Sequence, residues 1–424
     1  MDRSRSKELY GRAAGLMPGG VSSPVRAFSP YPTYIKRGRG SRLYDADGNE
    51  LIDCCLGFGP LILGHAHPSV VKAVQEQAGD GTLYGAPVEK EILLAETVRR
   101  HFPAMEMMRF VSSGTEATMH AVRLARGVTG RKKIVKMEGG FHGAHDSVLV
   151  KAGSGATTHS SPDSAGVPEE TASNTLTLAY NDIEAAERLL SAHRGEIAAV
   201  LVEPVMGNIG PVLPDGGYLQ QLRELTRKHG VLLMFDEVIT GFRLSMGGAQ
   251  ARFGVQADIT TLGKVLGGGL PIGAFGASAE IMRNVSPLGK VYQAGTFSGN
   301  PLSMAAGLAA LNELERVGHE GLERKGEMVR SQLAEVINAH GLDHQVAGIG
   351  SMFQIFMTDR PVRNHRDVMS CDASRFMRLF HALLERGVYV PPSQFETCFL
   401  STAHTDEDVR RIVDAYDDTL EAIR

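Results

Sequence analysis

Short apolar runs rich in β-branched residues alternate with helical patterns over residues 60–310, and this alternation constrains the fold of the 424-residue chain most strongly. Residues 133–137, 198–202 and 231–235 are such runs. Continuous apolar strands separated by helices are typical of a mostly parallel sheet covered on both faces. We therefore predict an α/β fold whose ligands bind at the carboxyl ends of the strands.

The pattern changes after residue 310, where long amphipathic helices such as residues 323–340 predominate. We predict an N-terminal segment (1–60), a large domain (61–310) and a smaller α+β C-terminal domain (311–424). In the first segment, Asp47-Gly48 between two alternating stretches indicates a β-hairpin turn, because the acidic residues around it lack EF-hand spacing. The non-periodic residues 152–166 are interpreted as a loop that closes over a site.

Composition narrows the classes of function. Charged residues make up 22% of the chain and the formal net charge is −4, so nothing favours nucleic acid or an anionic membrane as a partner. No apolar run approaches the roughly 18–20 residues of a membrane span. The polar N-terminus does not resemble a secretory signal. Four irregularly spaced cysteines indicate reduced thiols in a cytoplasmic protein, with neither a disulfide framework nor a metal site.

Residues 110–117 read Phe-Val-Ser-Ser-Gly-Thr-Glu-Ala, which indicates a strand, a turn of small residues and a helix. Such a turn presents unpaired backbone N–H groups at a positive helix end, where a phosphate can bind. A capping box between Ser113 and Glu116 explains the same residues, and both interpretations can hold at once.

A second apolar run ends in Asp236 and Glu237. An aspartate at a strand end can keep a pyridine nitrogen protonated, which makes a pyridoxal ring an electron sink. Two carboxylates there could equally bind a metal or cap the next helix. The run alone does not decide between these three interpretations.

Lys264 separates a strand-like run, residues 259–262, from the glycines at 267–269. Most lysines are solvated, but this one lies in an apolar stretch. A desolvated lysine has a lowered pKa and can form an imine with an aldehyde. A phosphate-binding turn, a strand-end aspartate and such a lysine together match the requirements of pyridoxal phosphate.

In these motifs the chain resembles the class-III aminotransferases, which are fold-type-I enzymes dependent on pyridoxal 5′-phosphate or pyridoxamine 5′-phosphate. Residues 295–301, Gly-Thr-Phe-Ser-Gly-Asn-Pro, also match that family. The resemblance implies a homodimer in which Thr296 reaches the cofactor phosphate of the neighbouring subunit. Without it, Phe141 would be interpreted as a core aromatic and His142 as structural; the resemblance implies that Phe141 stacks on the cofactor ring.

Narrower motifs, at residues 18–28, 151–155, 203–208 and 392–396, resemble the aminomutase branch of that family. The likeness is collinear from about residue 5 to residue 420. It implies isomerisation of glutamate 1-semialdehyde to 5-aminolevulinate in tetrapyrrole (porphyrin) biosynthesis. The amino exchange would proceed through pyridoxamine and pyridoxal phosphate and 4,5-diaminovalerate, so a closing loop would retain the diamine.

The resemblance also assigns roles to residues. Lys264 and Asp236 would be catalytic, and Arg26 would pair with the substrate carboxylate. The implied cofactor-binding residues are Ser113, Gly114, Thr115, Phe141, His142, Asn208, Asp236, Lys264 and Thr296. The implied substrate-binding residues are Ser22, Arg26, Phe58, Ser154 and Glu396.

The chain departs from the family at two positions. Phe58, in Gly-Phe-Gly-Pro, stands where tryptophan is usual, and Phe141 stands where tyrosine is common. The alternatives are an aminotransferase of the same family, acting on a β- or ω-amino acid with a 2-oxo acid acceptor, and a non-catalytic protein that binds pyridoxal phosphate.

Overall fold

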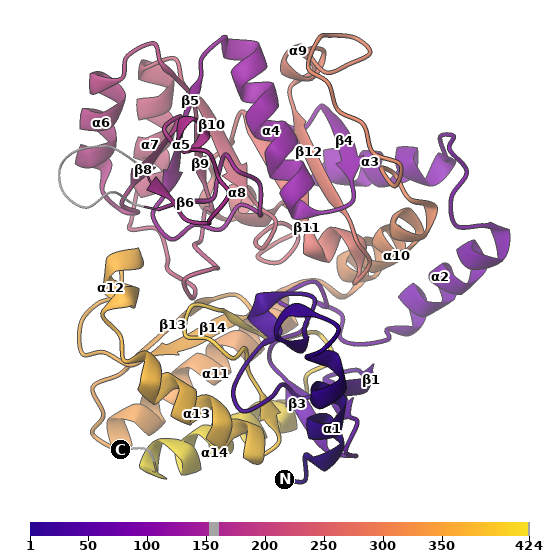
Figure 1. Ribbon diagram of the computed structural model, residues 1–424, viewed down its shortest axis with the longest axis vertical. Helices are drawn as coiled ribbons and strands as arrows, with labels where there is room; N and C mark the ends of the chain where they lie inside the picture. The colour runs from indigo at the N-terminus through magenta and orange to yellow at the C-terminus, as the bar shows by residue number, and fades with distance from the viewer. Residues whose placement is uncertain (152–160, 423–424) are drawn as a thin grey trace.

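The computed structural model describes residues 1–151 and 161–422. Two bodies lie one above the other in Figure 1, and the upper one is built around a seven-stranded sheet. Among these strands β12 alone runs opposite to the direction of the other six, which confirms a mostly parallel sheet. In sheet order the strands are β4 (Met107–Val111), β12 (Gly273–Ala277), β11 (Ile259–Gly263), β10 (Leu232–Asp236), β9 (Ile197–Val202), β5 (Lys133–Met137) and β8 (Thr175–Leu178).

Helices cover both faces of this sheet. On β9, Leu201 belongs to the same core as Leu124 of α4, whereas the next residue, Val202, belongs to the core that contains Leu222 of α7. Successive side chains of a strand point to opposite faces, so an apolar run without alternation is buried on both. The helices of this body are α2 (Pro68–Asp80), α3 (Glu89–His101), α4 (Gly114–Thr129), α5 (Glu169–Ala172), α6 (Ile183–Ala192), α7 (Tyr218–Lys228), α8 (Gly248–Phe253), α9 (Ala279–Met282), α10 (Pro301–Val317) and the 3-10 turn η3 (Lys264–Gly267).

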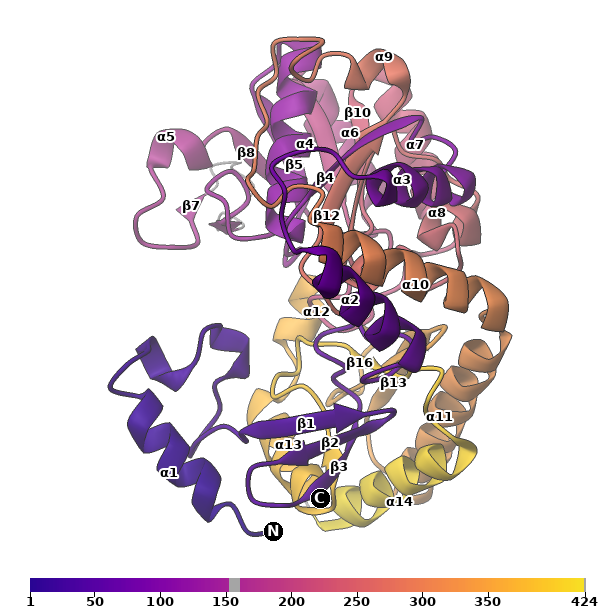
Figure 2. The same cartoon turned by 90° about the vertical axis from the view of Figure 1, so that its right-hand side faces the viewer.

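The lower body combines the two ends of the chain. Its two sheets are β1 (Ile35–Arg39), β2 (Arg42–Asp45), β3 (Glu50–Asp53) and β15 (Val388–Tyr389), and β13 (Gln345–Ile349), β14 (Met352–Phe356) and β16 (Cys398–Phe399). Its helices are α1 (Ser4–Ala13), α11 (Glu320–Ala339), α12 (His365–Met369), α13 (Ala373–Glu385) and α14 (Asp406–Ala422), with 3-10 turns η1 (Pro18–Gly20) and η2 (Pro24–Arg26). Figure 2 shows α1 and the turns after it standing out from this body.

The predicted hairpin is confirmed, because β2 and β3 pair antiparallel around Gly48, whose φ is 94°. β3 also pairs with β15 in parallel, so the N-terminal segment shares a sheet with the C-terminal part. The predicted boundary at residue 310 falls inside α10, which runs from Pro301 to Val317. The division into three regions therefore stays a prediction.

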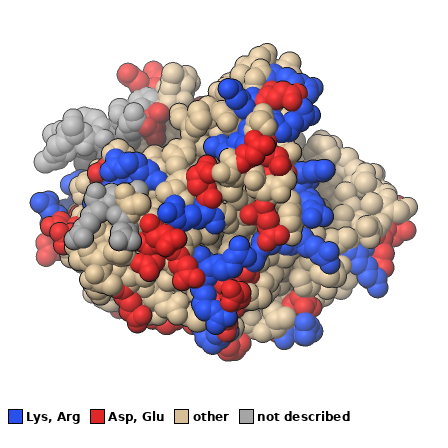
Figure 3. Space-filling model, turned by 90° about the horizontal axis from the view of Figure 1, so that it is seen from below, with Lys and Arg blue, Asp and Glu red and all other residues tan. Residues whose placement is uncertain are grey.

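The predicted closing loop, residues 152–166, lies mostly outside the described residues. Val150–Lys151 (β6) pairs antiparallel with Ser161–Pro162 (β7), so the prediction of a non-periodic loop was wrong for residues 161–162. Among the helices of the described ranges, none has the length and apolar character required to cross a membrane. On the face shown in Figure 3, cationic and anionic side chains are interspersed rather than gathered by sign.

Candidate active site

A cavity of about 640 Å³ lies where β10 and β11 end, and its wall includes side chains from both bodies. This is the edge of the sheet at which ligands of α/β proteins bind. The predicted site residues in the wall are Phe58, Ser113, Gly114, Thr115, Phe141, His142, Asn208, Asp236, Lys264 and Glu396. The structure thus brings together residues far apart in the sequence.

The turn before α4 forms one end of the cavity. Oγ of Ser113 accepts a hydrogen bond from the backbone N of Glu116 at 3.1 Å, as the capping interpretation predicts. The Glu116 carboxylate accepts from the backbone N of Ser112 at 2.7 Å, one residue before the N-cap position that a capping box requires. The first N–H groups of a helix have no intrahelical partner, so this end of α4 is suited to an anion.

Asp236, the last residue of β10, is held by three hydrogen bonds. Its Oδ1 accepts from Oγ1 of Thr261 at 3.0 Å and from the backbone N of Val238 at 3.1 Å. Its Oδ2 lies 2.8 Å from Nδ1 of His142. Asp236 and His142 are only 4% and 1% exposed, so this carboxylate has a fixed orientation in the wall.

Lys264 follows β11 directly and opens the turn η3, as the sequence predicts. Its φ of 45° is in the left-handed region, which non-glycine residues rarely adopt and which is found preferentially at functional sites. Burial lowers the pKa of the Lys264 amine, while the nearby carboxylates of Glu396, Glu203 and Asp236 oppose that shift. A lowered pKa increases the fraction of neutral amine, which is the nucleophilic form.

Phe141 lies in the cavity wall and is 54% exposed, so the core-aromatic interpretation is wrong. Its backbone N donates to Oε1 of Glu203 at 3.2 Å. Asn208 donates to the other oxygen of the same carboxylate at 2.9 Å. The Glu203 carboxylate therefore bridges the backbone of Phe141 and the side-chain amide of Asn208.

Two glycines allow close packing around this part of the cavity. A Cβ on Gly143, whose φ is 92°, would lie 2.6 Å from Cα of Thr115. A Cβ on Gly114 would lie 3.1 Å from Cγ1 of Val238. The residues present fit pyridoxal phosphate, because the wall combines a helix N-terminus for the phosphate, an accessible aromatic face, a fixed carboxylate and an amine of lowered pKa.

Phe58 and Glu396 also line the cavity. Burial raises the pKa of Glu396, and the nearby Lys264 amine opposes the shift. A Cβ on Gly59 would lie 3.6 Å from Cδ of Lys264, so the turn that carries Phe58 packs against the lysine stem. Phe58 itself has a φ of 66°, again in the left-handed region.

The structure does not bring four of the predicted site residues into the wall. Ser22 and Arg26 are exposed beside the cavity, and their neighbours Ser23 and Val25 line it instead. Thr296 is exposed and is not part of the wall formed by its own chain. Ser154 lies outside the described residues.

Glu203 is a wall residue that the sequence predictions missed. It is 2% exposed, and burial raises the pKa of its carboxyl group. It directly follows β9, the strand next to β10, so it lies at the same edge of the sheet as Asp236. The strand-end argument applied to Asp236 could have identified Glu203 too.

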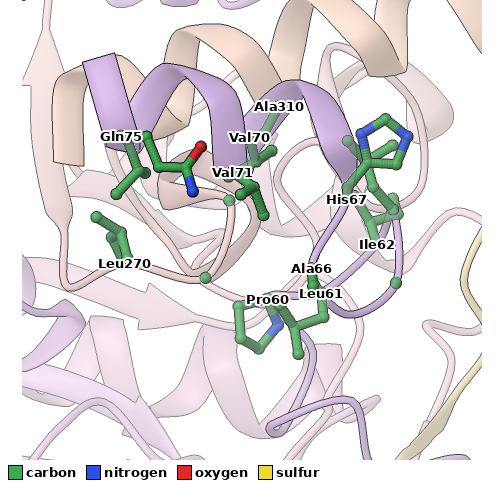
Figure 4. Close-up of a pocket in the computed structure, with 15 residues that line it drawn as sticks. Pro60, Leu61, Ile62, Ala66, His67, Val70, Val71, Gln75, Leu270 and Ala310 are labelled. Carbon is green, nitrogen blue, oxygen red and sulfur yellow. The ribbon is translucent and has the colours of Figure 1, made fainter. Parts of the chain in front are cut away.

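Figure 4 shows a second, smaller cavity of about 300 Å³ beside the candidate site. Pro60, Gly269 and Leu270 line both cavities. Among the described residues of its wall, His67 is the one ionisable side chain, and its Nε2 lies 3.8 Å from Oε1 of Glu313. The larger cavity therefore has the groups suited to acid–base and nucleophilic chemistry.

Comparison with known proteins agrees with this geometry. The model of the aminotransferase class-III family matches residues 25–420. The glutamate-1-semialdehyde 2,1-aminomutase of Methanococcoides burtonii is 55% identical over 413 residues, which are 97% of this chain and 98% of that protein.

Solved structures are also similar over nearly the whole chain. An omega-transaminase from Sphaerobacter thermophilus superimposes with a TM-score of 0.94 at 37% identity, and the match covers 99% of this chain and 98% of that one. A variant of a glutamate-1-semialdehyde aminomutase from Pseudomonas aeruginosa in complex with PMP gives a TM-score of 0.90 at 28% identity, with coverage of 99% and 95%.

Proposed function

Because the chain belongs to the class-III aminotransferase family, we propose that it is an isomerase dependent on pyridoxal phosphate that converts glutamate 1-semialdehyde into 5-aminolevulinate. This reaction would serve tetrapyrrole (porphyrin) biosynthesis. The observation that carries the proposal is the placement of Asp236 and Lys264 at the ends of two adjacent parallel strands, in the wall of one cavity. The likeness over nearly the full length to an aminomutase supports the choice of substrate.

When bound, pyridoxal phosphate supplies an electrophilic carbon and a ring that accepts electrons. Ser113, Gly114 and Thr115 would hold its phosphate at the N-terminus of α4, and Phe141 would cover one face of its ring. Asp236, fixed by His142 and Thr261, would hold a proton on the ring nitrogen, because an ionised carboxylate favours a cation beside it.

Lys264 has two tasks in this proposal. Its neutral Nζ would be the nucleophile that holds the cofactor at its carbonyl carbon. The same nitrogen would also accept and return protons at the reacting carbons, a role that suits an amine whose pKa is lowered by burial. Burial against the turn at Gly59 restricts the lysine stem, which limits the positions that Nζ can reach.

Arg26 is proposed to bind the substrate carboxylate. It is exposed on η2 beside the cavity, and the adjacent Val25 belongs to the wall. A planar guanidinium can form two parallel hydrogen bonds with a carboxylate. Ser22 precedes the wall residue Ser23, and Glu396, from the C-terminal part of the chain, lines the same cavity.

We also propose a homodimer in which Thr296 reaches the cofactor phosphate of the partner subunit. Thr296 is exposed, and the nearby Tyr292 and Phe297 are 68% and 57% exposed. Large aromatic side chains exposed on one segment are typical of an interface. Sedimentation of an active monomer would contradict this part of the proposal.

We also propose a cytoplasmic location for the protein. The four cysteines are unpaired, which is consistent with a reducing compartment.

An aminotransferase that acts on a β- or ω-amino acid is the second candidate, and the similarity to an omega-transaminase favours it. The two candidates differ in the need for a second substrate. An aminotransferase requires a 2-oxo acid to accept the amino group, whereas an aminomutase returns the nitrogen to the same carbon skeleton. The three wall carboxylates, Glu203, Asp236 and Glu396, and the buried Lys264 give no support to a non-catalytic role.

The deciding experiment offers the cofactor-loaded protein glutamate 1-semialdehyde as the only substrate and measures 5-aminolevulinate. The proposal predicts continuous formation over many turnovers without any 2-oxo acid. Lys264→Ala provides the matched control for non-enzymatic conversion. Product that forms only after addition of 2-oxoglutarate, or never exceeds one equivalent per site, would overturn the proposed function.

A further inference from the structure

The short helix α12 belongs to the C-terminal part of the chain but packs against the large sheet. Figure 1 and Figure 2 show it at the boundary between the two bodies. Val368 of α12 is fully buried in the core that includes Leu178 of β8 and Tyr180. An Asn364–Asp367 capping box fixes the start of this helix. Helix α12 therefore forms a contact between the two bodies.

Arg366 forms a bidentate ion pair with Glu138, the residue that follows β5. Nε and one terminal nitrogen of Arg366 lie 2.9 and 2.8 Å from the two carboxylate oxygens. The Glu138 side chain is 7% exposed, whereas that of Arg366 is 72% exposed. Within the described residues, no other hydrogen-bond donor reaches this carboxylate. A buried carboxylate that loses its partner is strongly disfavoured.

Further contacts hold α12 against the loop that begins at Glu138. A Cβ on Gly139 would lie 2.4 Å from Cδ2 of His365, so the imidazole packs directly on the backbone of the loop. Arg363 also pairs with Asp215, and its carbonyl oxygen accepts from Nδ2 of Asn181 at 2.9 Å. These contacts join α12 to loops at the carboxyl ends of the large sheet.

The loop that begins at Glu138 carries two residues of the candidate active site. Phe141 lies in the cavity wall, and Nδ1 of His142 bonds to Asp236. The loop contains glycines at positions 139, 140 and 143, so its backbone has few constraints of its own. Its geometry therefore depends on contacts with the rest of the fold. The backbone N of Phe141 donates to Glu203, and the Arg366–Glu138 pair holds the first residue of the loop.

We propose that Arg366 is a positioning residue for the cofactor: by pairing with Glu138 it holds the loop 138–142 where Phe141 covers the cofactor ring and His142 supports Asp236. This inference rests on the proposed cofactor site. It does not depend on which amino compound is the substrate. If Arg366 had a structural role alone, the ion pair would stabilise the contact of α12 with the large body and would not affect the affinity for the cofactor.

The test compares Arg366→Ala, Arg366→Lys and a control, Arg360→Ala. Arg360 precedes α12 on the same segment, and its side chain is 82% exposed. Its Nε lies 4.0 Å from Oδ1 of Asp359, so it forms a weak, exposed ion pair. The cofactor-free proteins are titrated with pyridoxal phosphate to obtain the dissociation constant. The visible circular dichroism of the bound cofactor reports the orientation of its ring, and the melting temperature of the cofactor-free protein reports folding.

We expect Arg366→Ala to weaken cofactor binding at least about 10-fold and to reduce the dichroic signal. Lysine retains the charge but not the bidentate geometry, so Arg366→Lys should recover part of the affinity. Arg360→Ala should match the wild type. If Arg366→Ala lowers the melting temperature while the dissociation constant and the dichroism stay unchanged, the positioning role is wrong.

Arg366→Ala leaves a buried carboxylate without a partner and could therefore fail to fold. Glu138→Gln removes the same ion pair but buries a neutral amide, which costs less, so this second variant can still test the role. It should weaken cofactor binding in the same direction, and addition of Arg366→Ala to it should have little further effect. Wild-type affinity in Glu138→Gln would overturn the inference. Because binding is measured without substrate, failure of the semialdehyde assay would leave this result intact.

Discussion

Nδ1 of His142 lies 2.8 Å from Oδ2 of Asp236, and both side chains are buried in the wall of the cavity. The other carboxylate oxygen is occupied by Thr261 and by the backbone N of Val238. A carboxylate held at both oxygens keeps its position when a charged ring is bound beside it. Contacts within the protein thus fix the orientation of the Asp236 carboxylate.

Asp236→Asn tests the charge of that carboxylate. The amide has almost the same shape but cannot stabilise a proton on the ring nitrogen, so we expect turnover to fall at least about 100-fold. Thr261→Val removes one hydrogen bond and keeps the charge, so it should reduce turnover less than about 10-fold. Steady-state assays of the two variants give the comparison. Full activity in Asp236→Asn would contradict the assigned role.

Gly143→Ala tests the close approach of the backbone to Thr115. The added Cβ would lie 2.6 Å from Cα of Thr115, which should displace the phosphate-binding turn and weaken cofactor binding at least about 10-fold. Gly48→Ala is the matched control, because Gly48 has a φ of 94° and, among the described residues, no atom lies within 4 Å of an added Cβ. Titration with pyridoxal phosphate should separate the variants. Equal affinities of the two variants for pyridoxal phosphate would show that the close packing of Gly143 against Thr115 does not affect cofactor binding.

Arg26→Ala tests the proposed binding of the substrate carboxylate. Loss of a charge-assisted hydrogen bond should raise KM for the semialdehyde about 10-fold or more, while the cofactor affinity stays at the wild-type value. Arg39→Ala, which removes an exposed arginine of β1, should leave both quantities unchanged. An unchanged KM in Arg26→Ala would exclude this residue as the carboxylate partner.

His404 makes the stability of the chain sensitive to acid. Burial lowers the pKa of this histidine to about 4, and its Nδ1 accepts hydrogen bonds from the backbone N and Oγ of Ser401. Between pH 4 and about 6.5 the unfolded chain binds a proton that the folded chain does not, so stability falls as the pH decreases through this window.

His404→Gln lacks that titration. Between pH 7.5 and 5, the free energy of unfolding of the wild type should decrease by about 2 kcal/mol more than that of His404→Gln. Urea denaturation at the two pH values measures the difference. Parallel loss of stability in both proteins would show that His404 binds its proton equally in the folded and unfolded states.

The sequence predicted the sheet and the strand-end residues well because both depend on local patterns. Apolar runs without alternation identify strands buried on both faces, and the residue at the end of such a run lies at the binding edge. Asp236 and Lys264 were located by this rule, and Glu203 obeys it too.

Features that depend on distant contacts could not be predicted in this way. The parallel pairing of β3 with β15 joins opposite ends of the chain, and β12 reverses direction between two strands that run the other way. The turn η2 places Val25, not Arg26, in the cavity wall, and the sequence of the turn has no pattern that indicates this. The Arg366–Glu138 pair has no local signal either.

The central claim is that Lys264 holds the cofactor, and chemical trapping tests it most directly. The protein loaded with pyridoxal phosphate is reduced with borohydride, digested and mapped by mass spectrometry, with Lys264→Arg as the control. The account predicts a pyridoxyl group on Lys264 and no specific labelling of the control. Labelling of a different lysine, or of none, in the wild-type protein would contradict it.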